Sequence, residues 1–103
     1  MSDLPCHIAV SGKSLVRLTF FVGDAQFQIE LEKAEQQDFR HVIENLETAG
    51  ASVYNGDEGT LMMMCDKDQL KVQFKLGGNY GSGVFAFQEI MEIVKKFPAP
   101  QSV

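Results

Sequence analysis

Four glycines stand within seven residues in the stretch KLGGNYGSGVF, which runs from Lys75 to Phe85. A glycine-rich segment between a strand and a helix is typical of phosphate sites, because backbone amides at the start of a helix hold anions. A Walker loop also requires a lysine and a hydroxyl residue after its last glycine, and Val84 and Phe85 stand there instead. The segment is therefore interpreted as a flexible connecting turn.

An anion site stays open as the alternative function of this loop, which spans residues 77–83. In that case the backbone amides would hold a phosphate, a nucleotide or another small ligand, and a nearby lysine would supply positive charge. The residues of this alternative site are Gly78, Gly81, Ser82, Gly83 and Lys75.

Residue types that act in catalysis or bind metals are few and poorly spaced. Neighbouring strand residues point to opposite faces, which separates the thiol of Cys6 from the imidazole of His7. The same alternation keeps Met62, Met63 and Met64 from converging on one soft metal ion. The sequence thus predicts no catalytic residue, metal or cofactor, and it favours a function other than an enzyme.

The segment SLVRLTFFVGDAQFQIELE predicts a β-hairpin in a defined register. If a two-residue turn begins at Gly23, Phe20 faces Phe27 on an apolar side and Arg17 faces Glu30 on the other. The turn and the alternation select the same register independently, which fixes the faces of both strands.

A second hairpin is predicted in TLMMMCDKDQLKVQFKL. A tip centred on Lys67 places Met63 opposite Val72 in the core. The same register turns Met62 and Met64 to the outward face, beside polar residues of the following strand.

Two amphipathic helices complete the expected elements. The spacing of apolar residues predicts a helix in KAEQQDFRHVIENLETAG, with Gly50 as its C-terminal cap, and another over residues 87–97. A short strand from Cys6 to Val10 precedes the first hairpin. The element order β-ββα-ββα predicts an α+β fold, with a four- to five-stranded antiparallel sheet and both helices packed on one face.

The length of 103 residues predicts a single domain, 1–103, with frayed ends at 1–5 and 98–103. The formal net charge is −5, and between Glu30 and Asp68 ten acidic residues outnumber three basic ones, a local net charge of −7. This sign disfavours direct binding of nucleic acid and favours a basic protein partner. With no membrane span and no signal leader expected, a cytoplasmic location is predicted.

The open face of the predicted sheet is the remaining candidate site. It combines a few adaptable apolar side chains with a polar rim, as protein interfaces do. We expect a small, acidic, non-catalytic protein-interaction module: an inhibitor, immunity or regulatory protein that occludes a partner, or a homodimer through this face. The expected partner-binding residues are Phe21, Met62, Met64, Arg17, Lys71, Asp57 and Glu58.

Overall fold

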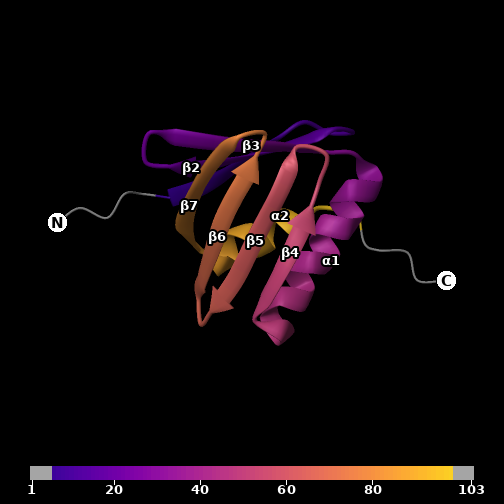
Figure 1. The fold of residues 1–103 in the computed structure, drawn as a ribbon. Coiled ribbons are helices and arrows are strands. Elements are labelled where there is room, and N and C mark those ends of the chain that lie inside the picture. Colours follow the sequence, from indigo (N-terminus) through magenta and orange to yellow (C-terminus); the bar gives the residue numbers. More distant parts are fainter. Residues whose placement is uncertain (1–5, 99–103) are drawn as a thin grey trace.

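A computed structural model describes residues 6–98 as seven strands and two helices (Figure 1). The segments predicted to be frayed, 1–5 and 98–103, lie outside the described residues apart from Pro98. In chain order the elements are β1 (Cys6–Ser11), β2 (Val16–Val22), β3 (Ala25–Leu31), α1 (Lys33–Ala49), β4 (Ala51–Asn55), β5 (Gly59–Asp66), β6 (Gln69–Leu76), β7 (Asn79–Ala86) and α2 (Phe87–Val94).

The strands form two antiparallel sheets. Sheet A has three strands in the order β1-β2-β3, and sheet B has four in the order β4-β5-β6-β7. The α+β class is confirmed, and the order of elements broadly follows the prediction. The structure differs from the prediction in two ways. Strands β4 and β7 are additional, and the strands of sheet A cross behind those of sheet B instead of continuing one sheet (Figure 1).

Both predicted hairpin registers are confirmed. Phe20 pairs with Phe27 in the first hairpin, where Arg17 pairs with Glu30 and forms an ion pair of 2.8 Å between Nη2 and Oε2. In the second hairpin Met63 pairs with Val72. The alternation of apolar and polar residues therefore determines which side chains of these four strands reach the core.

The glycine-rich segment is a strand, so its interpretation as a connecting loop was wrong. Gly77 and Gly78 form a two-residue turn with φ of 55° and 97°, and β7 follows directly. On β7, Gly81 points toward sheet A, where a Cβ atom would lie only 2.5 Å from Cζ of Phe27. Glycine is needed there because Phe27 of sheet A packs against the backbone of β7.

Aromatic side chains fill the space between the two sheets. Phe27 of sheet A stacks on Phe74 of sheet B with ring centroids 4.3 Å apart, and Phe20 lies 5.1 Å from the same ring. Near α1 a second contact joins Phe39 to Tyr54 at 5.1 Å. These contacts join the two sheets and α1 into one continuous core.

The helices cover one face of sheet B. Helix α1 packs against β4 and β5, and α2 packs against α1, β1 and β7. Helix α1 ends at Gly50 in the left-handed conformation, with φ of 84°, as predicted. Sheet A lies on the same side of sheet B as α2 (Figure 1). The opposite face, here called the outer face of sheet B, is covered by no element within residues 6–98.

A buried amide ties α1 to the first sheet. Gln36 is 5% exposed, and its Nε2 donates hydrogen bonds to the carbonyl oxygens of Ser14 at 3.0 Å and Leu31 at 2.9 Å. One side chain thus links the β1–β2 connection and the end of β3 to the helix. Backbone carbonyls that lack a strand partner are satisfied in this way.

Two carboxylates cover the outer edges of sheet A. The backbone amide of Glu30 on β3 donates to Oε2 of Glu58 at 3.2 Å, and that of Ile8 on β1 donates to Oε2 of Glu89 at 3.1 Å. Unpaired edge strands are templates for aggregation, and side chains that occupy their amides reduce this tendency.

The buried phenol of Tyr54 predicts a loss of stability at alkaline pH. Burial raises the pKa of Tyr54 above its ordinary value of 10.0, and nearby carboxylates, led by Glu35, raise it further. Above about pH 10 the unfolded chain releases this proton while the folded chain retains it, so the free energy of unfolding falls by at most ~1.4 kcal/mol per pH unit. Urea denaturation at increasing pH should show a shallower fall for Tyr54→Phe. The control Tyr80→Phe, which removes an exposed phenol, should keep the wild-type slope, and equal slopes for all three proteins would contradict the assignment.

Candidate functional site

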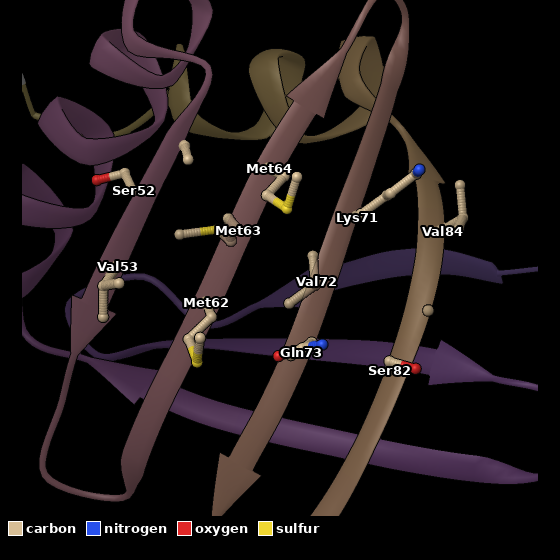
Figure 2. A pocket seen from close by; sticks show the side chains of 12 residues that line it. Ser52, Val53, Met62, Met63, Met64, Lys71, Val72, Gln73, Ser82 and Val84 are labelled. Carbon is tan, nitrogen blue, oxygen red and sulfur yellow. The ribbon is translucent and has the colours of Figure 1, made fainter.

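Alternate residues of four strands form the outer face of sheet B, and strand pairing arranges them in four rows, of which Figure 2 draws the two central ones. Four of their apolar side chains are about half exposed: Val53 at 46%, Met62 at 49%, Met64 at 55% and Val84 at 46%. The rows are Ala51, Met64, Lys71, Val84; Val53, Met62, Gln73, Ser82; Asn55, Thr60, Lys75, Tyr80; and, next to the β5–β6 turn, Asp66, Gln69, Ala86.

The first two rows line an open hollow of about 670 Å³. Figure 2 shows the side chains of Met62 and Met64 projecting from β5, with Val53 on one side and Lys71 on the other. All the lining residues come from the strands of one sheet, so no second element closes over the hollow. Pockets for small molecules bury most of the ligand surface, whereas this hollow leaves one side of any occupant uncovered.

The charge of this face differs from that of the chain. The four rows contain Lys71 and Lys75 and a single carboxylate, Asp66, a local net charge of +1, although the whole chain has a net charge of −5. Neither lysine forms an ion pair with any residue between 6 and 98. An apolar centre with unpaired cations at its side is a surface that can receive a partner with carboxylates.

Three of the predicted partner-binding residues lie together on this face: Met62, Met64 and Lys71. Phe21 does not, because it belongs to sheet A, where it stacks on His7 with ring centroids 4.6 Å apart. Arg17 is also on sheet A, in its ion pair with Glu30. The structure therefore divides the single face predicted from the sequence into two separate surfaces.

Asp57 and Glu58 lie in the turn between β4 and β5, beyond the end of the row that contains Asn55 and Thr60. The carboxylate of Glu58 accepts the amide hydrogen of Glu30, as described above. The acidic residues predicted to bind a partner thus border sheet A, and they do not surround Met62 and Met64.

The residues of the alternative anion site do not form a cradle in this fold. Gly81 and Gly83 pair with residues of β6 and point inward, while Ser82 and Lys75 point outward. At the start of α2, the amide of Phe87 donates to the carbonyl of Asp68 at 2.8 Å. The start of the helix and the glycines are therefore separate features, whereas a phosphate cradle requires them together.

The thiols and ionisable side chains form no reactive cluster in the described part of the chain. Cys6 and Cys65 lie on different sheets. Burial raises the pKa of the Cys65 thiol, and the nearby carboxylates of Glu47 and two aspartates raise it further. The Sγ atom of Cys65 also donates a hydrogen bond to the carbonyl of Lys67 at 3.6 Å. A thiol held protonated is a poor nucleophile. Within residues 6–98 no three His, Cys, Asp or Glu side chains are grouped to bind a metal.

Sequence reasoning missed the residues of this face that lie on β4 and β7, chiefly Val53 and Val84. The signals were present: ASVYN alternates around Val53, and Gly77-Gly78 between two alternating runs is typical of a two-residue hairpin turn. The segment with the four glycines was instead interpreted as a flexible connecting turn, with a ligand loop as the alternative.

Comparison of the chain with protein-family models, with curated proteins and with solved structures finds no match in any of the three. Among the helices of residues 6–98, neither α1 nor α2 has the length and hydrophobicity needed to cross a membrane. The functional interpretation therefore depends on the chemistry of the surface itself.

Proposed function

We propose that this chain is a non-catalytic protein-interaction module that binds a polypeptide through the outer face of sheet B. The observation that carries the proposal is the cluster of half-exposed Val53, Met62, Met64 and Val84 on a sheet face that no described element covers. Contiguous exposed apolar surface rimmed by polar groups marks interaction sites on soluble proteins.

The methionines suit this function physically. Met62 and Met64 are unbranched and can adapt their rotamers to the shape of a partner, which rigid β-branched residues cannot do as easily. The flanking polar residues Gln73 and Ser82 offer hydrogen bonds at the rim. Binding here would occlude part of the partner, which is the action expected of an inhibitor, immunity or regulatory protein.

Charges introduced at the centre of this face should abolish binding. The variant Met62→Lys with Met64→Lys places two ammonium groups in the apolar centre, and we expect affinity to fall at least about 30-fold, the usual loss for one hot-spot residue. The matched control is Gln26→Lys with Gln28→Lys, which adds the same charge to exposed positions of sheet A.

Photo-crosslinking tests the proposal in cells of the source organism. A photoreactive residue at Val84 should give one defined crosslinked polypeptide in the wild type and in the sheet A control, and none in the methionine variant. Thermal unfolding should be similar for all three proteins, because Met62 and Met64 are about half exposed. A crosslink of equal yield in the methionine variant, or no crosslink in the wild type, would refute the proposal.

A further inference from the structure

The lysines of the outer face indicate the charge of its partner. Lys71 pairs with Met64 and Val84, and Lys75 pairs with Thr60 and Tyr80, so the directly paired neighbours of each lysine are uncharged. The two cations outnumber the one carboxylate of these rows, Asp66, which favours a partner that brings its own carboxylates. The basic partner predicted from the sequence followed from the net charge of −7 between Glu30 and Asp68, whose carboxylates lie outside these rows except for Asp66.

The position of the apolar residues indicates that the partner lies over the sheet. Met62 and Met64 are on β5, two strands inward from the edge strand β7. A strand added to the edge of β7 would lie about 14 Å from β5, at three times the spacing of ~4.8 Å between neighbouring strands. A strand added to the edge of β4 would lie two spacings, about 10 Å, from β5. A strand at either edge would leave both methionines uncovered, so the occupant lies on the face itself.

A helix is the element that can lie there on its own. A single extended segment on the face would leave its backbone amides and carbonyls without partners, whereas a helix satisfies them internally. A helix about 10 Å in diameter covers two to three strands at their usual spacing. Lys71 and Lys75 are four residues apart on β6, roughly 13 Å along the strand, which corresponds to two to three helical turns.

A second copy of this chain fits the face less well. A two-fold dimer through the outer faces would bring together two copies of Lys71 and Lys75 with only Asp66 of each copy as a carboxylate. Helix α1 is acidic, but the large apolar side chains of Phe39, Ile43 and Leu46 are fully buried in its own core. Neither the outer face nor helix α1 of a second copy therefore supplies an exposed apolar stripe with carboxylates beside it.

We propose that the occupant of this face is an acidic amphipathic helix of another protein, lying along β5 and β6. Its apolar stripe contacts Val53, Met62 and Met64, and carboxylates two to three turns apart pair with Lys71 and Lys75. This inference rests on the proposed function and specifies the chemistry of the partner.

Fluorescence anisotropy with three labelled synthetic peptides of about 18 residues, five helical turns, tests the inference. The first is an amphipathic helix of Leu and Glu, the second has the same apolar positions with Lys in place of Glu, and the third alternates Val and Glu to favour a strand. We expect the acidic helix to bind most tightly. Lys71→Glu with Lys75→Glu should weaken its binding at least about tenfold and should improve binding of the basic helix.

The matched control is Lys13→Glu with Lys33→Glu, which changes the net charge equally at exposed positions outside this face and should alter the affinity less than about twofold. If the basic helix or the alternating peptide binds wild type as well as the acidic helix does, and Met62→Lys abolishes that binding, the inference is wrong while the proposed function stands. Absence of acidic-helix binding, or light scattering that shows a dimer disrupted by Met62→Lys, would also overturn it. The crosslinking experiment decides separately whether the proposed function fails.

Discussion

Gly81→Ala should lower the free energy of unfolding by about 2 kcal/mol or more, the usual cost of inserting a methyl group into a packed core. The new Cβ would lie 2.5 Å from Cζ of Phe27, whose ring is stacked on Phe74 and cannot retreat without breaking that contact. Gly83→Ala should cost less, because its Cβ meets Cγ2 of Val22 at 2.9 Å, near the end of a side chain. Urea denaturation followed by circular dichroism measures both effects.

The neighbouring Ser82→Ala is the matched control, since Ser82 points outward on the same strand and its change should stay within ~0.5 kcal/mol.

The glycine experiment also separates the two roles considered for this segment, core packing and anion binding. Packing predicts a loss of stability that no ligand reverses, whereas an anion site predicts that phosphate or nucleotide stabilises the wild type and that Gly81→Ala abolishes this effect. A Gly81→Ala variant as stable as wild type would contradict the packing of sheet A against β7.

Gln36→Met should destabilise the fold by about 2 kcal/mol, although methionine has nearly the same shape as glutamine. The substitution removes the two donors that satisfy the carbonyls of Leu31 and Ser14, and leaving a buried carbonyl without a partner costs ~1–3 kcal/mol. Ser14 is exposed, so water replaces part of its lost bond, and most of the cost arises at Leu31. Equilibrium unfolding in urea measures the difference.

The exposed position His41 on the same helix provides the control, because His41→Met should change the stability by less than ~0.5 kcal/mol. Gln36→Glu is a second test of the same contact. A carboxylate there would face two carbonyl oxygens, so it should destabilise more than methionine at neutral pH. If Gln36→Glu were as stable as wild type, the amide could not be the group that holds the two carbonyls.

The sequence predicted the parts of the fold that local pairing determines. The turn after Val22 and the alternation on either side select one register, and the structure confirms it from Arg17 opposite Glu30 to Phe20 opposite Phe27. Gly50 was likewise predicted correctly as the C-terminal cap of α1, because a cap of this kind depends on the backbone conformation of that one residue. Helix α2 is shorter than predicted and ends at Val94, but Phe97 is still buried beyond it, so the apolar spacing indicated burial better than helical length.

The division into two sheets could not be predicted in the same way. Which strands share a sheet depends on contacts distant in sequence, such as Phe27 against Gly81, and a hairpin carries no information about its neighbours. For this reason Met62 and Met64 were assigned correctly to an outward face, while Phe21 was joined to them wrongly. The hairpin register predicted the direction of each side chain but not which sheet would carry it.

The bond between Ile8 and Glu89 joins residues 81 positions apart, and this separation has a consequence for biosynthesis. The ribosome synthesises β1, β2 and β3 long before Glu89, so the amide edge of β1 stays exposed until α2 has been made. Edge amides left open in this period are available to other nascent chains on the same messenger RNA. Once α2 has emerged, Glu89 can accept the amide hydrogen of Ile8, and the period in which this edge can misassemble ends.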